Sequence, residues 1–313
     1  YGDRDRIDAT DAGRRKMLAD EVRRASNHMN GALIIPSFAV ERTQELLADL
    51  MLLMEASEIP SCPVFIDSPL ATRASEIFVA HKGELEHGDV LVRAMRSRDV
   101  HFTESVEQSK ALDFVHGFHI VIAASGMCEA GRIRHRLKNW LWREEGTVLL
   151  VGFQAAGTLG RILADGASTV RIQGEEVAVR ARIRALDAYS GHADGPELEH
   201  WLRERLPIAQ GVFLVHGEDA ALAAMKLRAG NVVAESRTYI PHIDSVFSLG
   251  ADGPLDMSPS MPVPRIAPDL AGHRDWNNDY QVLLQDLNEQ LRHAADDKSR
   301  GVIIRKIRRA LAE

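Results

Sequence analysis

Short apolar runs alternate with longer amphipathic stretches over the first half of the chain. The apolar runs are residues 32–36, 63–67, 117–124 and 146–152. The stretches with helical periodicity are residues 8–29, 41–56, 72–84 and 131–143. Each apolar run is hydrophobic at successive positions, which is typical of parallel strands covered on both faces. The alternation predicts an α/β fold with a parallel sheet flanked by helices.

The pattern changes after about residue 155. Alternating apolar positions over residues 168–184, around a Gly-Glu-Glu turn, predict a β-hairpin. The following elements are predicted as a helix at 196–205, a strand at 211–215 and a helix at 219–229. Residues 251–275 are rich in Pro, Asp and Gly, which predicts a linker or an extended arm, and residues 276–312 return to helical periodicity with a basic end.

Composition limits the class of protein without naming its activity. The chain has 313 residues, with 45% hydrophobic and 27% charged residues, as in a globular protein of one large or two ordinary domains. Its apolar runs are too short for a membrane span, so no membrane partner is expected. Two cysteines indicate a reducing compartment, and we expect the cytoplasm. A net charge of −7 restricts any RNA site to a local basic groove.

Two histidines beside carboxylates carry the clearest chemical signal. His192 lies in a Ser-Gly-His-Ala-Asp turn that ends at Asp194, and His216 follows a predicted strand just before Glu218. Imidazole ligates metals or transfers protons near neutral pH, and a carboxylate on its second nitrogen fixes the tautomer. The alternatives are a surface histidine at 192 and, at 216, a strand-capping histidine bonded to a carbonyl.

Several loops that follow predicted strands suit an anionic ligand. Ser125 and Gly126 begin a glycine-rich turn that resembles a phosphate-binding loop, but Arg132 stands where such loops need lysine, which argues against nucleotide hydrolysis. Free backbone N–H groups at such turns suit a phosphate, and the guanidinium of Arg42 suits bidentate phosphate binding. The alternatives are a tight turn that needs glycine and an exposed arginine in a first helical turn.

Asp67 and Ser68 follow the second apolar run directly. A carboxylate at this position can face a cleft at the end of the sheet. The alternative is that the pair belongs to the N-cap region of the next helix. Residues His116, His119, His135 and His242 have no partner at ligand spacing, and we expect them to be structural.

Taken in order, these runs resemble the β-CASP branch of the metallo-β-lactamase superfamily, whose members are RNA-processing nucleases. The matching runs are Tyr1-Gly2-Asp3-Arg4, Ile35-Pro36-Ser37-Phe38-Ala39 with Arg42, Gln44 and Glu45, Asp67-Ser68-Pro69-Leu70-Ala71, Ala124-Ser125-Gly126-Met127, Gly152-Phe153-Gln154 with Gly157-Thr158-Leu159-Gly160-Arg161, Ser190-Gly191-His192-Ala193-Asp194, and Val215-His216-Gly217-Glu218. Each run is short, and their order makes the resemblance specific over about residues 1–230.

The resemblance implies a domain order and a set of roles. It predicts a lactamase remnant with a linking helix at 1–24, a β-CASP domain at 25–150, the C-terminal half of the lactamase αββα fold at 151–250, and a linker with a helical tail at 251–313. It implies that His216 is a zinc ligand of a two-zinc site. It further implies that His192, oriented by Asp194, protonates the leaving group, and that RNA lies between the two domains with Arg42, Asp67, Ser68, Ser125 and Gly126 along its path.

The family's His-x-His-x-Asp-His zinc motif does not occur in the chain. A catalytic zinc needs about three protein ligands, so we expect an incomplete metal site and a chain that cannot cleave RNA alone. We also expect it to pair with a second copy or with a missing N-terminal lactamase half. The leading hypothesis is part of a zinc-dependent RNA-processing nuclease. The alternatives are a non-catalytic RNA-binding or scaffolding module and, less in keeping with the inserted domain, a small-molecule hydrolase.

Overall fold

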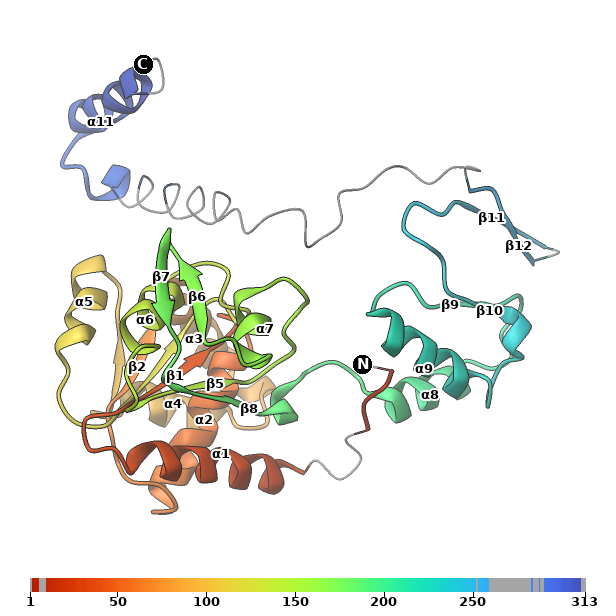
Figure 1. The fold of residues 1–313 in the computed structure, drawn as a ribbon, viewed down its shortest axis with the longest axis horizontal. Helices are drawn as coiled ribbons and strands as arrows, with labels where there is room; N and C mark the ends of the chain where they lie inside the picture. Colours follow the sequence, from red (N-terminus) through yellow and green to blue (C-terminus); the bar gives the residue numbers. More distant parts are fainter. Residues whose placement is uncertain are drawn as a thin grey trace. The chain divides into compact units, whose positions relative to one another are not determined.

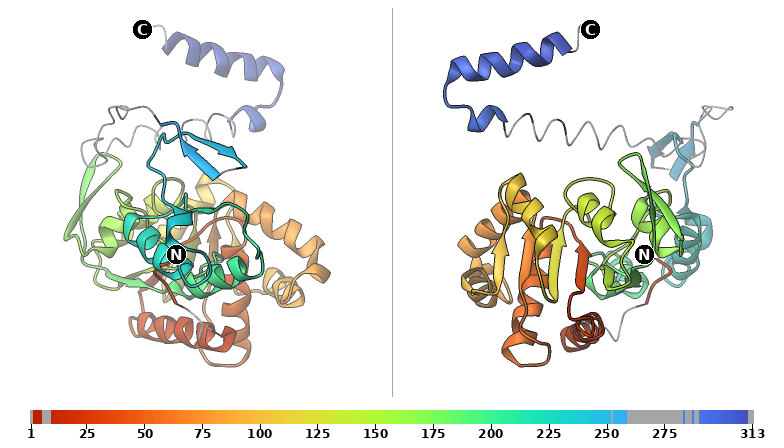
Figure 2. Two further views of the ribbon diagram at one scale, coloured as in Figure 1. Left: turned by 90° about the vertical axis from the view of Figure 1, so that its right-hand side faces the viewer. Right: turned by 60° about the vertical axis from the view of Figure 1, so that its left-hand side comes forward.

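A six-stranded parallel sheet is the centre of the fold in the computed structural model (Figure 1), which describes residues 2–5, 10–251, 253–258, 283, 287 and 290–310. The strand order is β3-β2-β4-β1-β5-β8, and every neighbouring pair is parallel. The strands are β1 (Ala32–Pro36), β2 (Val64–Asp67), β3 (Val100–Phe102), β4 (His119–Ala123), β5 (Gly146–Leu150) and β8 (Arg182–Ala185). Figure 2 (right) shows these strands running side by side.

The chain divides into two compact units, and the sheet belongs to the larger one. The larger unit comprises Arg15–Asp187 with Ala271–Glu313, and the smaller unit comprises Tyr1–Arg14 with Ala188–Leu270. The predicted domain boundary near residue 150 falls inside the larger unit. The reason is that β8 pairs with β5 and so ties residues 182–185 to the same sheet.

Helices cover both faces of the sheet, as the continuous apolar runs predict. On one face, Ile34, Val121 and Val148 pack in a core with helices α6 (Ile133–Trp140) and α7 (Leu159–Ala164). The hairpin of β6 (Thr169–Ile172) and β7 (Glu175–Ala178) adds Val170, Ile172 and Val177 to this core. Helices α1 (Asp11–Ser26) and α2 (Arg42–Glu55) lie on the opposite face (Figure 1).

The remaining helices of the larger unit connect the strands at the β2–β3 side of the sheet. They are α3 (Pro69–Ala80), α4 (Gly88–Arg96) and α5 (Val106–Ala111), with short 3-10 turns η1 (Lys82–Glu84) and η2 (Leu112–Phe114). Helix α11 (Asp297–Ala310) belongs to the described part of the C-terminal tail and has no buried side chain.

The smaller unit is built on two helices and short strands. Helices α8 (Gly195–Arg203) and α9 (Asp219–Ala229) pack through Leu202, Met225 and Ala229. Strand β9 (Val212–Phe213) pairs in parallel with β10 (Thr238–Tyr239), and β11 (Phe247–Gly250) forms a hairpin with β12 (Gly253–Asp256). The turns η3 (Asp187–Tyr189) and η4 (Glu235–Arg237) precede α8 and β10.

The α/β class and the parallel sheet between helices are confirmed, and the predicted helix at 219–229 is α9. The predicted hairpin is correct for residues 169–178, where Gln173 and Gly174 both have positive φ, as a two-residue hairpin turn requires. It is wrong for residues 182–185, which form the parallel edge strand β8.

The predicted linker at 251–275 is wrong for residues 253–256, which form β12. Residues 259–275 of that stretch, and most of the predicted helix before residue 290, lie outside the described residues. Among the helices that the structure describes, none has the length and apolar character that a membrane span needs.

Candidate functional site

The loops singled out in the sequence gather at one edge of the main sheet. They follow β1 (residues 37–41), β2 (residue 68 with the first turn of α3, 68–71), β4 (124–132) and β5 (151–158). Because these strands are parallel, their carboxyl ends meet at the same edge, where ligands bind in open α/β sheets. We call this edge, with its four loops, the carboxyl edge.

Helix α2 fixes the loops that follow β1 and β2. The Thr43 hydroxyl donates to the Phe38 carbonyl oxygen at 2.7 Å. The Gln44 amide is buried and donates to the carbonyl oxygens of Ala39, at 3.1 Å, and Ala71, at 3.4 Å. One side chain therefore joins both loops, which makes this part of the carboxyl edge rigid.

Arg42 is buried at the start of α2 and reaches toward the end of β5. Its Nη1 donates to the Val151 carbonyl oxygen at 2.9 Å, and its Nε lies 3.5 Å from a carboxylate oxygen of Glu45. The structure thus places the guanidinium within the fold at the carboxyl edge, joining α2 to the end of β5. Phosphate binding by this side chain stays a prediction.

Asp67 is fully buried at the end of β2 and accepts hydrogen bonds on both carboxylate oxygens. Thr103 donates to Oδ1 at 2.7 Å, and Ser109 donates to Oδ2 at 2.9 Å. Arg132 Nη1 lies 3.2 Å from Oδ1, and Arg136 Nε lies 3.4 Å from Oδ2. The carboxylate therefore ties β2 to the loop after β4, to the segment after β3 and to helices α5 and α6.

Next to Asp67 a cavity of about 1080 Å³ opens at the β2–β4 part of the carboxyl edge. Arg136 forms a 2.6 Å ion pair with Asp113, which also lines the cavity. The exposed side chains of Arg73 and Lys110 add positive charge to the wall. Ser68 lines it too, but its hydroxyl accepts from Ala71 N at 3.2 Å and caps α3, as the alternative interpretation of this residue predicts.

Ser125 and Gly126 form a closed turn after β4. The Ser125 hydroxyl accepts from the backbone N–H groups of Glu129 and Ala130 at 3.1 and 3.2 Å. The Gln154 amide donates to the Gly126 carbonyl oxygen at 3.0 Å, which joins this turn to the loop after β5. The Glu129 carboxylate accepts from Leu159 N at the start of α7. A side chain of the protein itself thus caps the N-terminus of α7.

Two side chains near the carboxyl edge have shifted pKa values. Burial raises the pKa of the Cys128 thiol far above its usual range, which argues against Cys128 as a nucleophile. Burial and the neighbouring Arg136 lower the pKa of His135, which lines the cavity. His119 is fully buried beneath Trp140, with its Nδ1 2.9 Å from the Gly117 carbonyl oxygen, as expected of a structural histidine.

The predicted proton donor and metal ligand lie in the smaller unit. His192 is exposed in the turn before α8, and its backbone N–H donates to the Ser190 hydroxyl at 3.4 Å. Asp194 is buried and caps α8 by accepting from Glu197 N at 3.0 Å. His216 is exposed after β9. The roles assigned to all three residues stay predictions.

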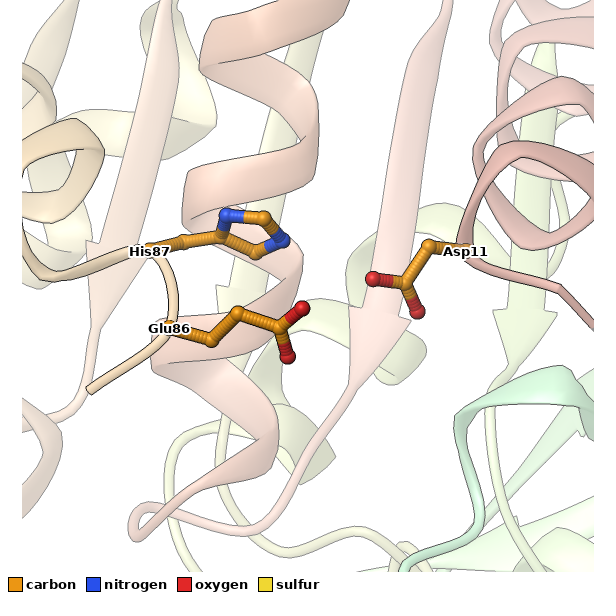
Figure 3. Close-up of side chains that lie close together, drawn as sticks. All are labelled: Asp11, Glu86 and His87. Carbon is orange, nitrogen blue, oxygen red and sulfur yellow. The ribbon is translucent and has the colours of Figure 1, made fainter.

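The described residues contain one group of three potential metal ligands, Asp11, Glu86 and His87, whose ligand atoms lie within 4.8 Å of one another (Figure 3). Asp11 begins α1, and Glu86 and His87 directly precede α4. Exposed acidic groups are common without a metal, and we assign none here. His216 belongs to no such group among the residues described.

The sequence alone did not predict the residues from distant parts of the chain that hold the carboxyl edge together. Arg132 and Arg136 contact Asp67 across more than sixty positions of sequence, and Gln154 contacts Gly126 across 28 positions. In the sequence, Arg132 stands out only as a departure from a phosphate-binding loop. The only sequence signal for this pair of arginines is that Arg132 and Arg136 are spaced one helical turn apart.

Comparison with known proteins gives two family matches. Residues 43–163 match the Beta-Casp domain, and residues 176–240 match the Zn-dependent metallo-hydrolase RNA specificity domain. The first covers α2 to α7 with most of the main sheet, and the second covers the end of that sheet and most of the smaller unit. The two matches follow each other in the order that the sequence motifs predict.

Three curated relatives align with about 60% of the chain. Ribonuclease TTHA0252 of Thermus thermophilus is 37% identical over 200 residues, covering 62% of this chain and 45% of that protein. Transcription termination factor FttA of Cenarchaeum symbiosum is 29% identical, covering 61% of this chain and 32% of that protein. An RNase J-like protein of Methanocaldococcus jannaschii is 26% identical, covering 60% of this chain and 43% of that protein. The chain spans less than half the length of these relatives. With both domains matched in order, it belongs to the β-CASP family of the metallo-β-lactamase superfamily.

Proposed function

We propose that this chain is the RNA-handling part of a zinc-dependent RNA-processing nuclease that hydrolyses phosphodiester bonds. The observation that carries the proposal is the pairing of a β-CASP domain with an RNA specificity domain. The ribonuclease named among the relatives supports the same reaction class. Loops held rigidly at the carboxyl edge are suited to position a polymer, because their side chains are already ordered before it binds.

The described residues do not complete a zinc site around His216. A catalytic zinc needs about three protein ligands and one open position, and His216 belongs to no group of three ligands in the described part of the chain. We therefore assign the metal centre to ligands beyond those described here, with His216 as one candidate contribution.

For the chain's own residues we propose acid–base and positioning roles. Cleavage of a phosphodiester requires a proton for the leaving oxygen, and imidazole transfers protons near neutral pH. His192 is exposed to solvent in a turn, as such a donor must be. Asp194 caps α8 directly after this turn and so fixes where the turn lies. RNA is the proposed ligand, and the cytoplasm, suggested by two free buried cysteines, is the proposed location.

The second candidate function is a non-catalytic RNA-binding module, favoured by the lack of a ligand group around His216 among the described residues. Zinc content per chain, measured on protein purified without chelator, separates the two. At least one zinc per chain that the His216→Ala variant loses, together with RNA cleavage, supports the nuclease. Little or no zinc, together with RNA binding, supports the binding module.

The experiment that tests RNA handling itself is binding of fluorescent single-stranded RNA at increasing salt. We expect measurable affinity at about 50 mM salt that falls steeply toward about 200 mM, because cations that neutralise phosphates release counterions. No binding at the lower salt would contradict both candidate functions.

A further inference from the structure

Phe38 exposes an aromatic ring at the carboxyl edge. It follows β1 directly, and 49% of the residue remains accessible to solvent. Large exposed apolar side chains at a place where ligands bind indicate an interaction surface more often than isolated exposed residues elsewhere. Val40 in the same loop and Leu70 at the start of α3 are also exposed.

The backbone under this ring is held in a single position. The Phe38 carbonyl oxygen accepts from the hydroxyls of both Thr43, at 2.7 Å, and Ser37, at 3.3 Å. The ring itself lies against Gly126, where an added Cβ would come within 3.0 and 3.1 Å of Phe38 Cε2 and Cδ2. The Cδ2–Cε2 side of the ring therefore lies close to backbone, and about half of the residue remains exposed.

A basic side chain accompanies the exposed apolar ones. Arg73 lies one turn after Leu70 on α3, so the two side chains share a helix face. Arg73 is exposed and makes no ion pair with any residue in the described part of the chain. The carboxyl edge and the neighbouring turn of α3 thus combine an exposed ring with a cation available for a phosphate, which suits single-stranded RNA better than an apolar protein segment.

We propose that Phe38 is a stacking platform for one unpaired RNA base, a specificity-determining contact that favours single-stranded RNA. The inference rests on the proposed RNA-handling function and names how the chain recognises its ligand. Every base has a flat face that stacks on an aromatic ring, so the contact does not depend on sequence. Bases inside a duplex are already stacked and cannot reach the ring.

The test compares Phe38→Ala with Trp142→Ala in binding to a fluorescent single-stranded RNA. Trp142 is a matched control because 50% of it is exposed, and it lies before β5, at the opposite edge of the sheet. We expect Phe38→Ala to weaken binding between about fivefold and about 150-fold, the range of base–aromatic stacking. Trp142→Ala and Phe38→Trp should bind as the unmodified protein does.

Two further arms separate stacking from a structural effect of the substitution. The affinity for duplex RNA should be equal in Phe38→Ala and the unmodified protein. A second set of RNAs lacks one base each, at successive positions along the strand. The unmodified protein should bind one of these RNAs less tightly than the intact strand. The Phe38→Ala variant should bind that RNA and the intact strand equally well. Equal weakening for single strands and duplex would show a folding defect and overturn the inference.

The proposed function and this inference fail in different ways. If the unmodified protein binds no RNA at low salt, the proposed function is wrong and the inference loses its basis. If the unmodified protein binds single-stranded RNA and Phe38→Ala binds it equally well, the function stands and the stacking role of Phe38 is wrong.

Discussion

At the scale of single residues, the carboxyl edge depends on polar side chains that are buried and fully engaged. Asp67 illustrates this, since two hydroxyls and two guanidinium groups surround its carboxylate. The sequence placed Asp67 correctly at the end of a strand. It did not reveal the arginines, because ion pairs between distant segments leave no periodic trace in the chain.

We predict that Asp67→Asn lowers the free energy of unfolding by about 3–5 kcal/mol, because it leaves the buried cation of Arg136 with only Asp113 as its counter-charge. Urea unfolding measures the effect. Asp165→Asn is the control, since Asp165 forms an exposed pair with Arg161 on one helix turn and its loss should change stability by no more than about 0.5 kcal/mol. Equal effects of the two substitutions would contradict the role given to Asp67.

His119 gives stability a pH dependence of defined sign. Burial lowers the pKa of its imidazole below the ordinary value of 6.5, so protonation favours the unfolded chain. The free energy of unfolding should therefore fall as pH drops below about 6.5. In His119→Phe the fall between about pH 7.5 and about pH 5.5 should be smaller, although His135 keeps a contribution of the same sign. An unchanged fall would show that His119 does not titrate in this way.

At the scale of elements, fully buried strands were the most predictable part of the fold. Strands β1, β4 and β5 are buried at every position, and their apolar runs alone located them. Strand β8 was missed because it lies at the edge of the sheet and carries Arg182 and Arg184, which resemble a solvent-facing hairpin. Strand β3 was also missed, because it is only three residues long and includes the exposed His101.

The start of α8 allows the structural and chemical roles of Asp194 to be separated. Its carboxylate and that of Glu197 cap the helix reciprocally. We predict that Asp194→Ala destabilises the protein by about 1 kcal/mol, whereas Asp194→Asn, which keeps a cap acceptor, changes stability far less. Urea unfolding of both variants tests this. A matching loss in Asp194→Asn would mean that the charge, and not the cap, holds this turn.

At the scale of the whole molecule, we propose that RNA contacts segments drawn from three separate strand ends of one sheet. The order of the motifs predicted the family, and the parallel topology explains why the motifs that follow β1, β2, β4 and β5 meet at one edge. The structure added what the sequence could not, namely the cavity beside Asp67 and the side chains that hold the loops together. Both depend on contacts between segments that are far apart in the chain.

The most direct test of this account is hydrogen–deuterium exchange with and without single-stranded RNA. We predict slower exchange on RNA binding in the loops of residues 37–41, 68–71 and 124–132, because bound ligand suppresses local opening. Exchange at the opposite edge, around residues 142–146, should not change. Protection at that opposite edge, or RNA binding with no protection in the three loops, would contradict the central claim that this chain handles RNA at the carboxyl edge of its β-CASP sheet.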